Sequence, residues 1–229
     1  MRNISDKKKC GELMSEIEWT HLFPDLSEGQ IDQINAYCQL LKEWNQGVNL
    51  VSRSDVDKLI EHHILPSLEP LAQVEIPPGA WVLDIGSGGG LPAIPLKIAR
   101  PDLQMLMVDS IRKKVLFLKK VIVELGLQNC SAMAERVEIL ANDPGFLNRF
   151  DRITARAVTT IENLLAYGAP FLAPEGRYLL WKGESDLEEL EMLQKKQGLK
   201  AQVYYARPAA IARSGKLGGL CWLDLAPGK

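Results

Sequence analysis

The sequence predicts an α/β fold with a mainly parallel, doubly wound sheet and a helical N-terminal extension. Short apolar runs alternate with segments in which apolar residues recur every three or four positions, the pattern of strands joined by helices. A glycine-rich turn at residues 86–90 separates the first run from a helical pattern that Pro92 opens. Such a strand–turn–helix unit is the place where doubly wound sheets approach a nucleotide-like ligand.

Seven strands are expected from residue 80 onward. They are residues 80–85, 104–109, 130–133, 151–155, 177–181, 201–205 and 220–225. Helices are expected between most of them, at residues 92–99, 111–126, 136–141, 160–172 and 186–196. Strands that alternate with helices favour parallel pairing with right-handed crossovers.

Residues 1–78 predict a helical extension that packs on a sheet domain spanning residues 79–229. Ser27 is a candidate N-cap for an amphipathic helix whose apolar positions run to Val48. Ser54 is a candidate N-cap for a second helix.

Composition is typical of a globular protein, with 46% hydrophobic and 24% charged residues. No run of about 18 apolar residues suggests a membrane span, and the basic start at residues 1–9 lacks the apolar segment of a secretion signal. We therefore expect a cytoplasmic protein, and a monomer. Four separated cysteines and three histidines predict reduced thiols and no metal site. The cysteines are Cys10, Cys38, Cys130 and Cys221.

The glycine spacing narrows the choice of ligand. Gly86, Gly88 and Gly90 alternate, and Leu91 stands where a dinucleotide-binding fingerprint has its third glycine. With Asp84 near the strand end, this pattern is similar to motif I of S-adenosylmethionine-dependent methyltransferases. That cofactor has no pyrophosphate, so close backbone approach and nearby carboxylates suit it. Asp84 would either receive the cofactor's ammonium group or brace the glycine loop.

Asp109 ends the second strand about 20 residues after the glycine turn, the spacing of a ribose-binding carboxylate. It would accept hydrogen bonds from the ribose hydroxyls, unless it serves only as an acid at the start of the next helix. Since an NAD enzyme would also place an acid here, Asp109 alone does not choose the cofactor.

Further motifs follow in one order along most of the chain. They are Trp44-Asn45 with Asn49-Leu50; His63-Ile64-Leu65; residues 83–92 with Ile94-Pro95-Leu96; Asp109-Ser110 with Lys113-Lys114 and Phe117-Leu118; Arg136-Val137-Glu138; Phe150-Asp151 with Ala155-Arg156-Ala157; and Lys182-Gly183. In these motifs the chain resembles the RsmG (GidB) family of bacterial ribosomal RNA methyltransferases. The resemblance implies a class I, Rossmann-like methyltransferase sheet, S-adenosylmethionine as cofactor, and methylation of N7 of one guanosine in 16S ribosomal RNA. The partner would be that RNA or the small ribosomal subunit.

The resemblance and the strand ends together give a set of expected site residues. The cofactor-binding residues would be Asp84, Gly86, Gly88, Gly90, Leu91, Asp109, Ser110, Ile111, Val137, Glu138 and Arg156, and the catalytic residues Arg156 and Lys182. Val137 and Glu138 fall where the family binds adenine, although Glu138 could also be a solvated helix acid. Arg156 would lie near the cofactor or the target guanosine, and Lys182 could face phosphate. Their alternatives are a surface ion pair and a structural lysine.

His63 and Asn45 also match family positions, and hydrogen bonding between the helical extension and the core is their alternative role. Two departures weaken the match. Pro66 precedes Ser67-Leu68 where the family usually has Asp, so any role of that Asp is absent. The tail at residues 207–229 also fits the family pattern poorly.

A net charge of −2 means that RNA contacts would need local basic patches. Candidates are Arg112-Lys113-Lys114 with Lys119-Lys120, Lys7–Lys9, and Arg207, Arg213 and Lys216. Each could equally be a solvated face.

Guanine N7 has a lone pair and no proton to lose, so the expected chemistry needs positioning rather than a general base. Two other functions remain open on the sequence. One is a methyltransferase acting on a small molecule or a protein, and the other is a nucleotide-binding oxidoreductase, against which the missing third glycine argues.

Overall fold

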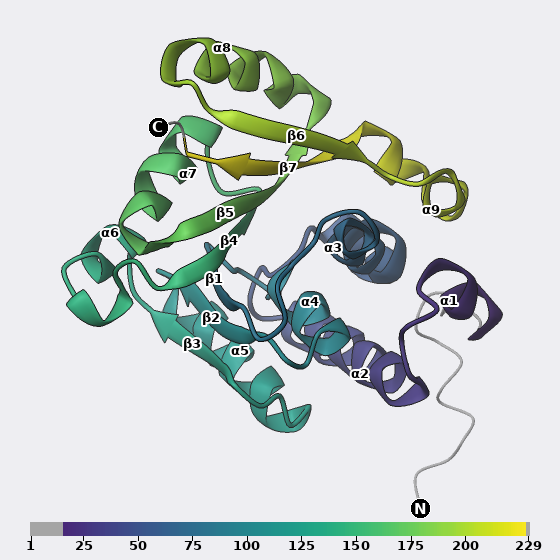
Figure 1. Cartoon of the computed structure of the whole chain (residues 1–229). Coiled ribbons are helices and arrows are strands. Elements are labelled where there is room, and N and C mark those ends of the chain that lie inside the picture. Colours follow the sequence, from purple (N-terminus) through teal and green to yellow (C-terminus); the bar gives the residue numbers. More distant parts are fainter. Residues whose placement is uncertain (1–15, 228–229) are drawn as a thin grey trace, which may run out of the picture.

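The computed structural model describes residues 16–227 and contains a seven-stranded sheet with helices on both faces (Figure 1). The strand order is β3-β2-β1-β4-β5-β7-β6. The strands are β1 Trp81–Ile85, β2 Gln104–Asp109, β3 Cys130–Ala134, β4 Phe150–Arg156, β5 Leu172–Gly183, β6 Lys200–Tyr205 and β7 Leu220–Ala226. The strands β1 to β5 pair in parallel, and β7 runs antiparallel to both β5 and β6. The expected doubly wound, mainly parallel sheet is therefore confirmed.

Strand β5 is the element whose expected start was wrong. It begins at Leu172 rather than at residue 177, because Leu172 pairs with Phe150 ahead of a break in the register with β4. The helix expected at residues 160–172 accordingly ends early, as α7 Ile161–Gly168. A Cβ at Gly168 would lie 2.5 Å from the ring of Tyr178, so glycine lets the helix end close against the sheet.

Side chains alternate between the two faces of the sheet, as the twofold period of a strand requires. Val82 and Met107 belong to one buried cluster and Leu83 and Ile85 to the other. The first face carries α4 Ala93–Ala99 and α5 Arg112–Glu124, together with the N-terminal helices (Figure 1). The second face carries α6 Val137–Leu140, α7 and α8 Leu187–Gln197.

Within the described residues, the N-terminal extension contains α1 Glu16–Leu22, which the sequence did not predict, followed by α2 Glu28–Trp44. Ser27 caps α2, as predicted, in a reciprocal capping box with Gln30. The helix ends at Trp44 rather than at Val48. The reason is that the Asn45 side chain accepts hydrogen bonds from the backbone N–H groups of residues 50 and 51, at 2.8 and 3.0 Å, and folds the chain back.

The second predicted helix is a series of short turns. A 3₁₀ helix at Arg53–Lys58 leads into a π-helix at Ile60–Ile64, then α3 Leu65–Leu68 and a 3₁₀ turn at Glu69–Ala72. The expectation that Ser54 is the N-cap was wrong. Ser52 holds that position, because its hydroxyl accepts a hydrogen bond from the Ser54 N–H.

The extension and the sheet domain share one hydrophobic cluster. Ile34 and Leu41 of α2 belong to the same buried cluster as Ile94 of α4 and Phe117 of α5. The boundary between residues 78 and 79 stays a prediction.

The C-terminal part of the chain is tied to the extension. Arg207 precedes α9 Pro208–Arg213, and its Nε lies 2.8 Å from Oε1 of Glu69, which is fully buried. The carbonyl oxygen of Pro66 accepts hydrogen bonds from the indoles of Trp181 and Trp222, at 2.6 and 3.2 Å.

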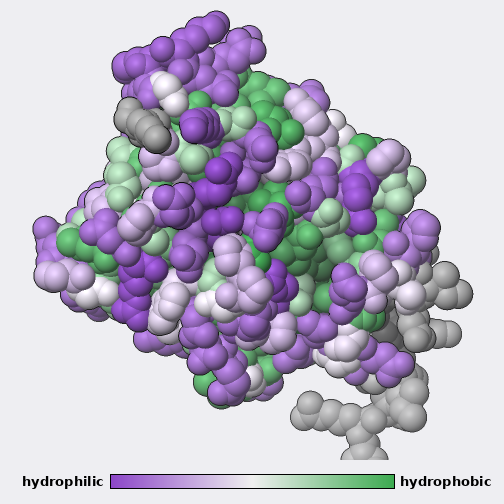
Figure 2. Space-filling model, viewed as in Figure 1, coloured by the Kyte–Doolittle hydropathy of each residue, from purple (hydrophilic) through white to green (hydrophobic). Residues whose placement is uncertain are grey.

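Figure 2 shows apolar surface in a hollow over the region of α3 and α4, and a pocket there is lined mostly by apolar residues. Residues of the 207–229 tail, Arg207 and Trp222, therefore pack against the N-terminal extension, and Arg207 also lines this pocket.

Candidate functional site

The glycine loop after β1 is anchored to the end of β2. The N–H groups of Gly86 and Ser87 donate to the carbonyl oxygen of Val108, at 2.8 and 3.1 Å. Gly86, Gly88 and Gly90 have φ angles of 69°, 54° and 89°, in the left-handed region that favours glycine. The loop conformation therefore requires the alternating glycines that the sequence analysis singled out.

Space around the three glycines differs. A Cβ at Gly86 would lie 2.6 Å from Val158, and one at Gly90 would lie 2.5 Å from Ile94. At Gly88 the nearest atom, a backbone oxygen, would be 3.9 Å away. Gly86 and Gly90 thus permit close internal packing, and Gly88 is the one of the three that leaves room for a ligand against the backbone.

Asp109 holds the glycine loop and the start of α5 together. Its Oδ2 accepts a hydrogen bond from the Gly88 N–H, and its Oδ1 accepts one from the Ile111 N–H, both at 2.8 Å. The residue is 8% exposed. A carboxylate has about four lone-pair sites, so these two bonds leave acceptor capacity for hydroxyl groups in the neighbouring pocket.

A pocket of about 160 Å³ lies beside this carboxylate. It brings together five residues of the expected cofactor set, namely Gly86, Asp109, Ser110, Val137 and Glu138. Sequence reasoning missed the remaining lining residues, which are Ile85, Val108, Glu135, Arg136, Val158 and Tyr167. The other six expected cofactor residues are not among the lining residues; they are Asp84, Gly88, Gly90, Leu91, Ile111 and Arg156. The pocket has acids beside apolar side chains, so its lining can meet both hydroxyl groups and an apolar ring, although its volume is enough for only part of an adenosine.

Asp84 lies buried behind the glycine loop. Its Oδ1 accepts a hydrogen bond of 2.6 Å from the Thr154 hydroxyl, and its Oδ2 is buried without a hydrogen-bond partner in the described structure. Burial raises the pKa of the Asp84 carboxyl to about 6, against the lowering effect of the Thr154 hydroxyl. This oxygen is itself buried, behind the loop that a ligand would approach.

Arg156, at the end of β4, reaches across to the N-terminal extension. Its Nη2 donates to the carbonyl oxygen of His62 at 2.9 Å and lies 3.2 Å from Nδ1 of His63. Burial lowers the pKa of the guanidinium to about 10, so it stays charged at neutral pH. The next residue, Ala157, has a φ of 55°, an uncommon conformation for a residue with a side chain. Arg156 does not line the pocket beside Asp109.

The two histidines also meet one carboxylate. Nδ1 of His62 lies 3.0 Å from Oδ1 of Asp55, and Nε2 of His63 lies 3.4 Å from Oδ2 of the same residue. His63 therefore links the extension to Arg156, and Asn45 closes the turn after α2. His63 thus has the role of linking extension and core that was its alternative to direct function, whereas Asn45 bonds only residues 50 and 51 of the extension itself.

Tyr37 is a further link that sequence reasoning missed. Its hydroxyl donates a hydrogen bond of 2.6 Å to the carbonyl oxygen of Gly89, and burial raises its pKa well above the ordinary value. Its place three residues after Ile34, on the apolar stripe of α2, was the available signal.

Lys182, near the end of β5, is held in the structure. Its Nζ donates to the carbonyl oxygen of Thr159 at 2.7 Å and lies 3.7 Å from Oδ1 of Asp186. Both partners belong to the segments that follow β4 and β5. The lysine thus joins these two loops, which is its structural role.

The structure describes some of the basic side chains that were expected to bind RNA. Arg112 and Lys113 are exposed on α5, and Lys114 is half-buried. Arg207 and Arg213 pair with glutamates of the extension. Lys7–Lys9, Cys10 and the side chain of Lys216 lie outside the described residues.

Residues 16–227 contain neither a group of metal-ligating side chains nor a membrane-spanning helix. No cluster of three or more potential metal ligands occurs in this part of the chain. No helix described there is long and apolar enough to cross a membrane.

The comparisons place this site in a family. The model of the family described as rRNA small subunit methyltransferase G (GidB) matches residues 30–213, which include every site residue described above. This chain belongs to that family.

Individual relatives agree with the GidB family model. The ribosomal RNA small subunit methyltransferase G of Chromobacterium violaceum is 37% identical over 169 residues, which cover 74% of this chain and 78% of that protein. The protein of the same name from Nitrosococcus oceani is 40% identical over 169 residues, covering 74% and 76%.

Solved structures support the fold. A SAM-dependent methyltransferase from Aquifex aeolicus has a TM-score of 0.54 at 15% identity, covering 82% of this chain and 97% of that one. A chain of a fibrillarin/Nop5p complex has a TM-score of 0.55 at 14% identity, covering 71% and 82%. The Rossmann-like methyltransferase sheet expected for a GidB protein is confirmed.

The buried carboxyl of Asp84 gives a stability prediction. Its pKa is raised in the folded protein, so the folded state binds more protons than the unfolded state between about pH 4 and 6, and stability falls as pH rises through this window. We expect Asp84→Asn to gain stability relative to wild type by about 2–3 kcal/mol between pH 4 and pH 7. Urea unfolding of both proteins at a series of pH values measures this difference, and a difference that does not change with pH would contradict it.

Proposed function

We propose that this chain transfers a methyl group from S-adenosylmethionine to N7 of a guanosine in the 16S ribosomal RNA of the small ribosomal subunit, in the cytoplasm. The observation that carries the proposal is the GidB family match over residues 30–213, which encloses the glycine loop and the pocket beside Asp109. The family's relatives are named as ribosomal RNA small subunit methyltransferases. Mapping N7-methylguanosine in 16S ribosomal RNA, with and without the gene, tests the proposal directly.

The residues present fit the cofactor. The acceptor capacity of Asp109 suits ribose hydroxyls, and the open backbone at Gly88 suits close approach. Val137 and Glu138 line the same pocket, and the adenine would lie against them. When bound, S-adenosylmethionine supplies an electrophilic methyl group on its sulfonium.

The chain's own contribution to the reaction is positioning. N7 of guanine carries a lone pair and no proton, so no side chain has to remove one. Holding two reactants in line contributes about 7–11 kcal/mol to such a step. Arg156 holds the π-helix of the extension beside the end of β4, and in this role it positions the surface that meets the guanosine.

Loss of the Asp109 carboxylate tests the cofactor site. We expect Asp109→Ala to stay folded and to weaken S-adenosylmethionine binding by about 1.5–3 kcal/mol, because a charged acceptor is lost. Isothermal calorimetry measures the affinity. Asp102→Ala is the matched control: Asp102 also braces a loop, by accepting a hydrogen bond from the Gly79 N–H at 2.8 Å, but it lies at the other end of β2. Unchanged affinity in a folded Asp109→Ala protein would remove Asp109 from the cofactor site.

The basic start of α5 tests the RNA surface. Lys113→Glu with Lys114→Glu should weaken RNA binding about tenfold or more and leave cofactor affinity unchanged, because contacts to phosphates become repulsive. Acids are favourable in the first turn of a helix, so the change should not unfold α5. Binding of wild type, of this double variant and of Lys195→Glu, an exposed lysine on α8, is measured at several salt concentrations. A wild-type affinity that does not fall with salt, or normal methylation by the double variant, would move the RNA surface elsewhere.

The base-free mechanism predicts a particular pH profile. With both substrates saturating, the single-turnover rate should show no sigmoidal rise between about pH 6 and 9. Arg156→Ala should lower the rate at every pH, because it misplaces cofactor or guanosine rather than removing a proton acceptor. Rapid-quench measurements on small-subunit substrate give the profile. A rise with a pKa assignable to one side chain would reject the mechanism and favour a different acceptor atom.

A further inference from the structure

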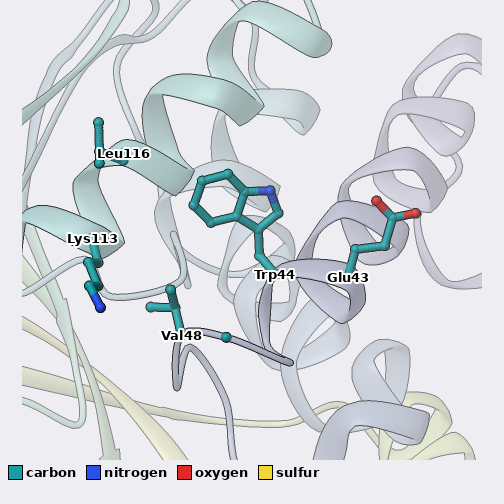
Figure 3. Close-up of a pocket in the computed structure, with 6 residues that line it drawn as sticks. Glu43, Trp44, Val48, Lys113 and Leu116 are labelled. Carbon is teal, nitrogen blue, oxygen red and sulfur yellow. The ribbon is translucent and has the colours of Figure 1, made fainter.

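A groove of about 510 Å³ lies between the end of α2 and the first turns of α5 (Figure 3). We call it the Trp44 groove, and its lining residues are Glu43, Trp44, Gly47, Val48, Lys113 and Leu116. Figure 3 shows the indole of Trp44 projecting from the end of α2 toward α5, where Lys113 and Leu116 stand one turn apart. The volume is in the range of small-molecule sites, about 300–1,000 Å³.

The aromatic side chain of the groove is fixed in place. The Trp44 ring packs against Phe117 with centroids 5.6 Å apart, and Phe117 is fully buried. Trp44 itself is only half-buried, so part of its indole faces solvent in the groove. Because the ring is already fixed, little side-chain conformational entropy is lost when a ligand binds to it. Nucleobases stack on exposed aromatic rings of this kind.

Charge at the groove favours a polyanion. Lys113 lines it, and Arg112 beside it is also exposed on α5. The one acid in the lining, Glu43, accepts a hydrogen bond of 2.7 Å from the neutral Gln39 amide and keeps its negative charge, which Lys113 and Arg112 together outweigh. A base plane next to a free cation is the combination that single-stranded nucleic acid requires.

Two lining residues of the Trp44 groove lie close along the chain to residues that contact Asp109 or the glycine loop. Lys113 comes two residues after Ile111, whose N–H donates a hydrogen bond to Asp109. The Cα atoms of Ile111 and Lys113 are therefore at most about 7 Å apart. On the other side, Val48 precedes Leu50 by two residues, and a Cβ at Gly89 would lie 3.3 Å from Leu50. A strand whose guanosine enters beside the glycine loop would therefore pass close to the groove.

We infer that the Trp44 groove binds an unpaired nucleobase next to the target guanosine, with the base stacked on the Trp44 indole and an adjoining phosphate paired with the Lys113 ammonium. This inference rests on the proposed function, in which RNA is the methyl acceptor. The groove selects for an unpaired strand, because a base inside a duplex presents no free face to the indole.

Tryptophan fluorescence tests the stacking. Trp19, Trp181 and Trp222 are at most 3% exposed, and Trp44 and Trp81 are the two that solvent reaches. Titration of the full chain with oligouridylate should quench the fluorescence of wild type and of Trp81→Phe, and the quenching should be lost in Trp44→Phe. Phenylalanine keeps an aromatic ring against Phe117, so the variant should fold. Quenching that persists in Trp44→Phe would overturn the inference.

Methylation kinetics give a second, independent readout. Trp44→Leu and Lys113→Gln should each raise the KM for naked 16S ribosomal RNA about tenfold, with cofactor affinity near wild type. The Tm should stay near wild type in Lys113→Gln and fall in Trp44→Leu, which loses the ring contact with Phe117. Lys195→Gln, a matched exposed lysine on α8, should leave KM unchanged.

The outcomes separate the two proposals. An unchanged KM in both groove variants would overturn the groove assignment and leave the proposed function intact. A loss seen only with intact small subunits and not with naked RNA would indicate a protein occupant, and would also overturn it. A wild-type protein that methylates no ribosomal RNA would refute the proposed function, whatever the quenching shows.

Discussion

The hydrogen bond between the Gly88 N–H and the Asp109 carboxylate is the interaction on which the site depends. It joins the loop after β1 to the end of β2, and through the second oxygen it also fixes the first turn of α5. The N–H groups of Gly86, Ser87 and Gly90 donate to backbone carbonyl oxygens, and the Asp109 carboxylate is the acceptor for the N–H group of Gly88. The same carboxylate borders the pocket, which means that loop geometry and ligand affinity share one group.

The N-terminal extension is hydrogen-bonded to residues of the glycine loop and of the end of β4. Tyr37 binds the carbonyl of Gly89 from one side, and Arg156 binds the carbonyl of His62 from the other. Each bond crosses between the extension and the sheet domain, and each is buried or nearly so, where a lost partner leaves an unsatisfied group costing about 1–3 kcal/mol. Because the π-helix at Ile60–Ile64 presents its carbonyls to Arg156, the irregular helix is part of this connection.

Local spacing explains what could be predicted from the sequence. The glycines, Asp109 and the cap at Ser27 depend on residues within one strand–turn–helix unit or one helical turn, so their roles follow from short patterns. The contacts of Arg156 and the presence of Val158 and Tyr167 in the pocket depend on distant segments, and no local pattern encodes them. Ser52 and Ser54 lie two residues apart, and either could be the N-cap of the same helix by its sequence. Small differences in backbone geometry decide which of them takes that position.

The first turns of α5 connect the two halves of the proposed reaction. Ile111 binds the carboxylate that borders the cofactor pocket, and Lys113 lines the Trp44 groove. In-line methyl transfer is sensitive to small errors in the relative position of donor and acceptor, since its acceleration comes from proximity and orientation. In the proposed arrangement, a single helix whose start is held by Asp109 would support cofactor and RNA from one rigid element. Because the reaction needs no proton acceptor, this shared support is the main demand that the chemistry places on the fold.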